Sequence, residues 1–354
     1  MQVAVTYHLS PGKWLVYLLR CVIHLTGEED MSSTMVRLFI GMIALLGITG
    51  CSLKYTADDP PAPGFVYQNV DRKPITMQVV DQRDSVQYMV GISGLQRVEL
   101  TLENLNDPVG WIANGLVKEF NARGVPLQLA AKESGAPADL TLTVRKYQLI
   151  NHRASGFSAW ESYNIFLGQV TMGSKNCSIP SFFFNSKIPV WSMDEVQKPC
   201  ISDPMAVVVK DVASKINQCL FGYGVSNDDL QKLTTAALST VKADSPTACF
   251  PLIDLGGTNN PAAMETLKTF AGHGDSFVHN CAVSAIGTLG AQNEFAFLEG
   301  RFNYFAANDR VMPLKAIGDI GSSQAQNFLR QVQAGELYRE ENGVRYCTDL
   351  YLSR

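Results

Sequence analysis

The chain is poor in the residues that most enzymes use for catalysis. It has five histidines in 354 residues, and the three beyond residue 51 (His152, His273 and His279) lie in no serine- or cysteine-hydrolase signature. No Cys-x-x-Cys pair occurs, which argues against a thiol redox enzyme. The glycine-rich segments 222–224 and 287–290 lack the strand before and the basic residue after that a phosphate loop needs. The sequence therefore predicts a non-enzymatic protein without a cofactor.

Charge is also sparse. Only 18% of the residues are charged, the formal net charge is −4, and the sequence pI is near 5.8. A nucleic-acid partner needs a basic stripe, and none is present, so we expect no nucleic-acid binding. The hydrophobic fraction of 46% fits a folded globular body.

A long hydrophobic run is absent as well. The apolar run at residues 38–48 follows Arg37 and is too short to cross a bilayer, since a spanning helix needs roughly 20 apolar residues. A basic leader, an apolar run and a small residue before a cysteine form the order of a cleavable export signal. The quartet Ile48-Thr49-Gly50-Cys51 resembles a bacterial lipobox. The resemblance implies cleavage before Cys51 and its acylation, with palmitate as an expected acyl group; the alternative is an uncleaved anchor or a buried helix.

The start of the chain fits this signal poorly. An apolar stretch at 14–25 is broken by Arg20 and followed by Glu28-Glu29-Asp30, whereas export leaders rarely carry acidic residues. We therefore interpret residues 1–30 as an over-called start and 31–50 as the lipoprotein signal peptide. The residue after the acceptor cysteine is Ser52, which resembles the residue found there in lipoproteins that are sorted to the outer membrane. The expected location is the cell envelope, lipid-anchored to the outer membrane and facing the periplasm.

Six cysteines remain beyond Cys51, and an even set in an exported protein suggests disulfides. Cys177 and Cys200 bracket a segment that could form a hairpin from strands at 182–184 and 188–191. The pattern predicts a disulfide between them. Cys249 and Cys281 fall on apolar helix faces and are predicted to be buried thiols.

Residues 51–66 are predicted to be the lipidated cysteine and an extended linker, because prolines crowd residues 60–63. Alternating apolar residues then predict strands at 75–79, 98–102 and 140–144, with further strands at 163–170 and 182–184. Helices are predicted to open at N-caps Asp107 and Asp203, each followed by proline, and to end near Gly124 and Gly222. These elements predict that residues 67–225 form an α+β two-layer sandwich, an antiparallel or mixed sheet with two helices.

The strand at 75–83, the helix ending in Asn121-Ala122-Arg123-Gly124 and the strand at 138–144, behind a lipobox, resemble the YajG-like small bacterial lipoproteins. The likeness covers residues 67–222, and the segment 177–200 departs from the pattern. The resemblance implies an envelope-facing α+β domain and no particular activity.

The carboxy-terminal part contains a repeat of about 31 residues. Ala285-Ile286-Gly287 recurs as Ala316-Ile317-Gly318, the pair at 297–298 recurs at 328–329, and 252–256 is a degenerate earlier copy. Such periods indicate stacked helical pairs. These repeated segments resemble HEAT-like repeats of the phycobilisome-lyase type. In that type an arginine, here Arg310, stands six residues before the Ala-Ile-Gly segment. Residues 226–354 are thus predicted to be a short all-α HEAT-like repeat domain, capped by helices at 228–241 and 336–352.

His273, Asp275, His279 and Cys281 lie within nine residues and have zinc-ligand chemistry. We predict no metal site, because Cys281 is expected to point into the stack and His279 occupies the position that Arg310 fills one repeat later.

Arginine and aromatic residues favour protein interfaces, and one segment of the repeats is rich in both. The candidate protein-binding residues are Arg301, Phe302, Tyr304 and Arg310; the alternative is that the aromatics pack inside and the arginines are merely solvated. The predicted function is a membrane-anchored periplasmic lipoprotein that acts as a protein-binding or envelope-assembly adaptor for unidentified envelope proteins. The alternatives are a periplasmic enzyme or enzyme maturation factor, or a small-ligand receptor.

Overall fold

The computed structural model describes most of the chain beyond residue 52. The described residues are 53–353, except 85–88, 94, 95, 99, 104, 132–136, 156, 157, 188–193, 244, 246, 291 and 306. The described residues belong to one compact unit, Ser52–Arg354. The predicted early start, signal peptide and lipid acceptor Cys51 lie outside the described residues, as does the strand predicted at 188–191. No helix in the described part is long and apolar enough to cross a bilayer.

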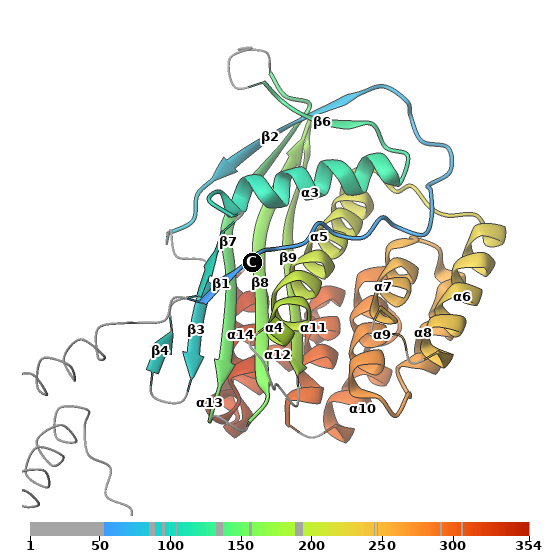
Figure 1. Ribbon diagram of the computed structural model, residues 1–354. Helices are drawn as coiled ribbons and strands as arrows, with labels where there is room; N and C mark the ends of the chain where they lie inside the picture. The colour runs from blue at the N-terminus through green and yellow to red at the C-terminus, as the bar shows by residue number, and fades with distance from the viewer. Residues whose placement is uncertain are drawn as a thin grey trace, which may run out of the picture. The chain divides into compact units, whose positions relative to one another are not determined.

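A mixed β-sheet of seven strands dominates the first half of the described chain (Figure 1). Its strands are β2 (Ile75–Asp81), β3 (Met89–Ser93), β4 (Gln96–Val98), β6 (Leu127–Leu129), β7 (Leu140–Arg153), β8 (Trp160–Met172) and β9 (Lys175–Lys187). The last three form an antiparallel meander. On its other edge, β7 pairs in parallel with β2 along one half and with β3 along the other half. Strand β6 pairs with the outer edge of β2, and β4 pairs with the outer edge of β3. The sheet is therefore five strands wide along each half of β7.

The alternating patterns at 75–79 and 140–144 correctly predicted β2 and β7, and those at 163–170 and 182–184 fall in β8 and β9. The pattern at 98–102 is divided between two sheets. Here β4 ends at Val98, while β5 (Leu100–Leu102) pairs in parallel with β1 (Leu53–Tyr55) as a separate two-stranded sheet.

Helices α3 (Pro108–Ala122) and α5 (Asp203–Ile216) pack on the sheet, α3 over β2, β6 and β7, and α5 over β8 and β9 (Figure 1). Asp107 caps α3 as predicted, because its carboxylate accepts a hydrogen bond from the Gly110 N–H at 2.8 Å. The predicted N-cap at Asp203 is wrong. The short helix α4 (Asp194–Gln197) and the π-helical turn η1 (Lys198–Ser202) lead directly into α5, with helical backbone angles at Ser202 and Asp203. Asp203 therefore lies inside a continuous helical path.

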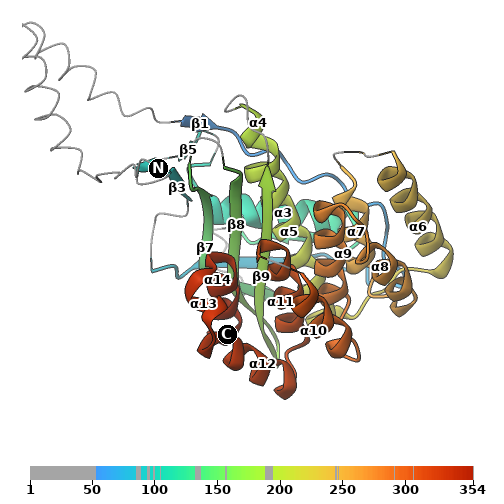
Figure 2. The ribbon, with the colours of Figure 1, turned by 90° about the horizontal axis from the view of Figure 1, so that it is seen from below.

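The last helix of the chain lies against the opposite face of the sheet, seen from below in Figure 2. The Ser181 hydroxyl on β9 donates to Asp211 of α5 at 2.6 Å. The ring of Tyr163 on β8 lies 5.3 Å from that of Tyr346 on α14 (Asn342–Leu352). Tyr163 pairs with Phe184, which is an odd number of residues from Ser181, so the two contacts lie on opposite faces. One hydrophobic core runs through both regions.

The chain beyond residue 226 is helical. Its helices are α6 (Asn227–Lys242), α7 (Cys249–Gly257), α8 (Met264–Phe270), α9 (Ser276–Leu289), α10 (Phe295–Tyr304), α11 (Val311–Ile320), α12 (Ser323–Ala334), α13 (Glu336–Glu340) and α14. Helices α7, α9 and α11 contact one another in that order, and α11 contacts α14. Helix α8 packs on α9, α10 on α11, and α12 on α14. The helices predicted at 228–241 and 336–352 are confirmed as α6 and the pair α13 and α14.

Glycines spaced by 31 residues allow helices α7, α9, α11 and α14 to approach one another closely. A Cβ atom added to Gly287 would lie 2.6 Å from the Cα of Ala316, and one added to Gly256 would lie 2.7 Å from the Cα of Ala285. Gly318 makes a similarly close approach to α14. Because real Cβ atoms essentially never come within 3.0 Å of a neighbour, the glycine at this repeat position sets the spacing of the helices.

Substituting Gly287→Ala is expected to lower the free energy of unfolding by about 1–3 kcal/mol, since the new methyl group forces α9 and α11 apart. The matched control is Gly300→Ala in α10, where the added methyl group meets no atom within 4 Å. This control should stabilise the protein by about 0.5–1 kcal/mol through helix propensity alone. Urea unfolding measures both; equal stabilisation by the two variants would contradict the close helix contact.

Two disulfides are present among the described residues, and neither was predicted. Cys177 on β9 bonds to Cys219 in the turn η2 (Asn217–Phe221), and Cys249 on α7 bonds to Cys281 on α9. The predicted Cys177–Cys200 bond is wrong, because β9 pairs with β8 and α5 then returns the chain to the start of β9. Cys200 is a buried thiol in a small apolar cluster. The prediction that Cys249 and Cys281 are packed thiols is also wrong.

Residues 56–67, which we call the strap, connect β1 to β2. They form neither helix nor strand, and they are held against the body. The Gly64 N–H donates to the Asp254 carboxylate at 3.0 Å, and the Tyr67 N–H donates to the Arg123 carbonyl at 2.9 Å. Phe65 and Tyr67 are buried. Much of the predicted linker therefore packs on the folded body.

Candidate functional site

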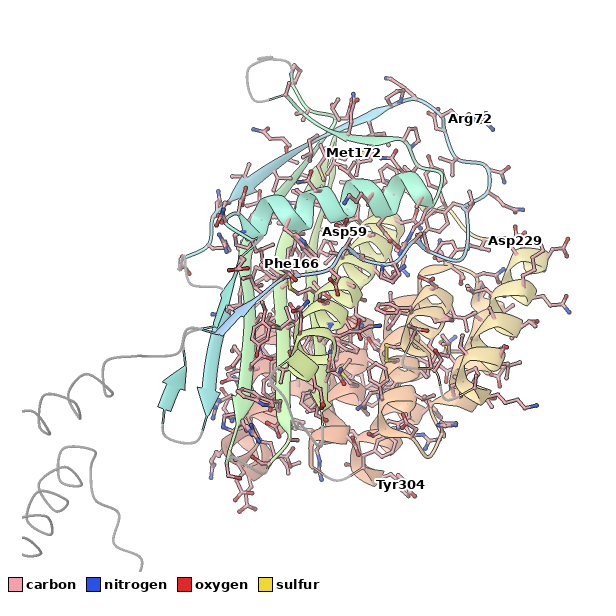
Figure 3. All side chains as sticks on the ribbon, viewed as in Figure 1. Asp59, Arg72, Phe166, Met172, Asp229 and Tyr304 are labelled. Carbon is pink, nitrogen blue, oxygen red and sulfur yellow. A yellow bond between two sulfur atoms is a disulfide. The ribbon has the colours of Figure 1, made fainter. Side chains whose placement is uncertain are left out.

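The structure places the four predicted interface residues in different environments. Tyr304 is 79% exposed at the outer end of α10 (Figure 3), whereas Phe302 is only 4% exposed. Arg301 stacks over the rings of Phe297 and Phe305, at 5.2 and 5.9 Å.

Phe302 belongs to the interior. Its ring makes an edge contact with Phe328 at 5.3 Å, and the Arg310 guanidinium lies 5.8 Å above it. Arg310 also approaches the Glu341 carboxylate at 3.8 Å. The prediction that Phe302 is a surface contact is therefore corrected: it is a packing residue, and Arg310 is partly covered.

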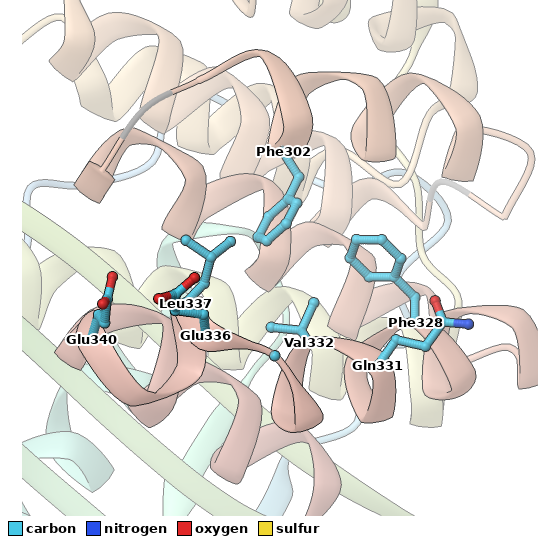
Figure 4. Close-up of a pocket in the computed structure, with 8 residues that line it drawn as sticks. Phe302, Phe328, Gln331, Val332, Glu336, Leu337 and Glu340 are labelled. Carbon is cyan, nitrogen blue, oxygen red and sulfur yellow. The ribbon is translucent and has the colours of Figure 1, made fainter.

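An apolar pocket, which we call the outer pocket, opens beside Phe302 (Figure 4). Its volume is about 320 Å³. The apolar side chains that line it come from α10, α12 and α13: Phe302, Phe328, Val332 and Leu337. Glu336 and Glu340 stand at its rim and are exposed. The arrangement presents apolar surface bordered by negative charge.

A buried cluster of charges, the strap network, joins the strap to α3, α5 and α7. The Arg123 guanidinium contacts the Glu119 carboxylate at 2.8 Å and donates to the Tyr67 hydroxyl at 2.9 Å. The Lys210 ammonium lies 2.9 Å from Asp254 and 3.3 Å from Glu119. Burial raises the pKa of Asp254, although Lys210 lowers it. The two cations balance the two anions, so the network is suited to fixing the strap in place.

A second buried cluster, the stack network, joins α5 to α9 and α11. The Lys315 ammonium lies 3.1 Å from Asp211 and 2.7 Å from Asp319, and it donates to the Thr288 hydroxyl at 3.0 Å. Lys215 contacts the same two carboxylates at 2.8 and 2.6 Å. Burial raises the pKa of Asp211, but the two lysines lower it more, so it lies well below its usual range. Paired charges of this kind are structural.

A larger pocket, the junction pocket, lies where the strap, η1, α5, α6 and α7 meet. Its volume is about 500 Å³. Its carboxylates are Asp58 and Asp59 of the strap, Asp203 of α5 and Asp254 of α7, whereas Lys198 is the one cation in its described lining. Apolar side chains of α6 and α7 complete the wall. The pocket thus has a negative charge and an apolar side.

Asp203 is the most unusual of these carboxylates. It is 9% exposed and has no hydrogen-bond or ion-pair partner among the described residues. Burial raises its pKa to about 6; Lys198 lowers the pKa and Asp58 raises it. A buried carboxylate without a partner is costly, so the group is poised to accept a cation.

The histidine cluster considered for zinc is used otherwise. The Asp275 carboxylate caps α9 by accepting from the Val278 N–H at 2.9 Å, and Cys281 is in a disulfide. The His279 ring stacks on Phe305 at 4.4 Å, and burial lowers its pKa. Among the described residues, no group of three or more His, Cys, Asp or Glu side chains could hold a metal ion.

Sequence reasoning missed both charge networks and the junction pocket. A signal was available in part, because Lys210 and Lys315 each interrupt an apolar run in their helices. A lysine at a core-facing helix position requires a buried counter-charge. The pairing of Lys315 with Asp319 was readable, because the two residues are four apart on one helix. The contacts of Lys210 with Asp254 and of Lys315 with Asp211 were not readable, since these carboxylates come from distant segments.

No protein-family model and no curated protein matches the chain. Several solved structures are similar to part of the chain, and two of them are described here. One is described as an uncharacterized protein and is 14% identical, with a TM-score of 0.30 over 47% of this chain and 99% of that one. The other is a Xanthomonas campestris protein of the family DUF330, 13% identical, with a TM-score of 0.28 over 47% of this chain and 92% of that one. Both TM-scores are too low for either likeness to carry an argument about this chain.

Proposed function

We propose that this protein is a lipid-anchored envelope lipoprotein that binds another protein, without catalysis, through the outer pocket of its helical region. The observation that carries the proposal is the apolar pocket of about 320 Å³ on the outer helices, bordered by two exposed carboxylates. An apolar recess with a polar rim is the usual anatomy of a protein interface.

The proposal includes the finer assignment of the fold. The successive helices α7 to α12 are taken as HEAT-like repeats, in which α8 packs on α9 and α10 on α11, and the equal spacing of the glycines at 256, 287 and 318 supports this assignment. The sheet with α3 and α5 is taken as a two-layer sandwich of the YajG-like kind. Helical repeats of this length commonly bind proteins on an extended face.

The chemistry of the outer pocket specifies the partner. Glu336 and Glu340 favour a segment that carries lysine or arginine, while Phe328 and Leu337 favour an apolar side chain between the basic residues. The partner is therefore an envelope protein with a basic segment that presents one buried apolar side chain.

The anchor is the acylated Cys51, and the target is the periplasmic side of the outer membrane. Mass spectrometry of the mature amino terminus tests this part: an acylated Cys51 supports it, and an unmodified Cys51 refutes it.

Reversing charge at the rim tests the binding site. The variant Glu336→Arg with Glu340→Arg should abolish capture of the partner by membrane-extracted protein. Folding should be preserved, because surface substitutions change stability by under about 0.5 kcal/mol. The matched control is Glu265→Arg on α8, whose side chain is also exposed but remote from the pocket.

Quantitative mass spectrometry of the captured proteins, after crosslinking in intact cells, is the readout. A protein retained by the wild type and the control but lost from the rim variant supports the proposal. Equal capture by all three proteins would remove the outer pocket as the binding site.

A further inference from the structure

The geometry points to a second binding site: the junction pocket takes a small organic cation, a primary amine with a short apolar body, and Asp203 is its counter-charge. This site is separate from the outer pocket. It involves different elements and a different class of ligand, so it does not depend on the proposed adaptor function.

Two of the four carboxylates in the junction pocket are already paired. Asp254 contacts Lys210 at 2.9 Å, and Asp59 contacts Lys118 at 2.7 Å. Asp203 is nine-tenths buried and lines the pocket, yet among the described residues no donor or cation lies within bonding distance of it. The pocket therefore contains one carboxylate that is both desolvated and available.

The local backbone explains why Asp203 is available. An aspartate before a proline would normally cap the helix and accept a backbone N–H. Because η1 continues into α5, no side chain makes a capping hydrogen bond there. An ammonium group bound beside Asp203 would satisfy the carboxylate and restore its low pKa.

The rest of the pocket limits the ligand. Leu233, Phe250 and Pro251 supply an apolar wall suited to methylene groups. The described residues offer no set of three metal-ligating side chains, which favours an organic cation over a metal ion. Asp58 is exposed at the mouth of the pocket and could receive a second amine on the same ligand.

Isothermal titration of the purified full chain with 1,5-diaminopentane tests the site, with 1-pentanol as the neutral probe of similar size. We expect saturable binding of the diamine and none of the alcohol. Asp203→Asn should weaken the affinity for the diamine by at least about tenfold, since a charge-assisted hydrogen bond is lost. The control Glu265→Gln, at an exposed carboxylate of α8 that does not line the junction pocket, should change affinity by less than about twofold.

The pH dependence of diamine binding is a second readout, which would not change if Asp203 had only a structural role. Binding by the wild type should strengthen as pH rises through about 6, where Asp203 loses its proton, and this dependence should vanish in Asp203→Asn. Ala236→Trp, at an exposed position of α6 that lines the pocket, should abolish binding without touching Asp203. Absence of diamine binding, equal binding by Asp203→Asn, or equal binding of 1-pentanol would each overturn the inference.

Discussion

Substituting Lys315→Met is expected to lower the free energy of unfolding by about 3–5 kcal/mol. Methionine keeps most of the volume but removes the ammonium that lies between Asp211 and Asp319. Those two buried carboxylates would then share Lys215 alone. Breaking a buried ion pair on one side strands the remaining charge, which explains the size of the effect.

Lys232→Met on α6 is the matched control, because Lys232 forms its pair with Asp229 on the surface. An exposed ion pair is screened by water and contributes little to stability, so the control should unfold almost as the wild type does. Chemical denaturation measures both variants. If both variants lowered the free energy of unfolding by a similarly small amount, the charges of the stack network would be no more important for stability than a surface ion pair.

The same network predicts a pH dependence. The pKa of Asp211 lies below its unfolded value of about 3.9, so its stabilising contribution is present above that pH and is lost as pH falls toward the folded pKa. The wild type should therefore lose stability steeply below about pH 4. In Lys315→Met this acid dependence should be shallower, because one of the two lysines that lower the pKa of Asp211 is gone.

Truncating Leu298→Ala or Leu329→Ala should each cost about 2–5 kcal/mol. The two leucines are 31 residues apart, on α10 and α12, and both are completely buried. Removing either side chain leaves a cavity between helices that cannot collapse freely. Equal burial at equivalent positions predicts losses of similar size.

Leu238→Ala is the control for these two variants, because Leu238 is exposed on α6. It should change the free energy of unfolding by under about 0.5 kcal/mol. If Leu298→Ala and Leu329→Ala unfolded no more easily than this control, the phase of the 31-residue repeat would be wrong.

Periodicity predicted the fold well where one face of an element is buried. The alternation at 140–144 lies in β7, and the two copies of the Ala-Ile-Gly segment, at 285–287 and 316–318, lie in helices α9 and α11. Local signals failed where a neighbouring segment overrode them. The Asp203-Pro204 pair looks like a helix start, but η1 supplies the preceding turn.

The candidate sites were predicted less well, because they depend on long-range contacts. Phe302 was assigned to the surface from composition, yet its partner Phe328 comes from the next helical pair. Cys177 was paired with the nearer cysteine in sequence, whereas α5 brings back Cys219. Only the tertiary arrangement decides which of several equivalent residues meet.

Site-specific photo-crosslinking in intact cells tests the central claim most directly. A photoreactive residue at Gln331, which lines the outer pocket and is exposed, should crosslink to one envelope protein. The crosslinked peptide should contain an apolar side chain flanked by lysine or arginine. The same residue placed at exposed Gln231 on α6 should give no such product. Identical products at both positions, or none at Gln331, would contradict protein binding at the outer pocket.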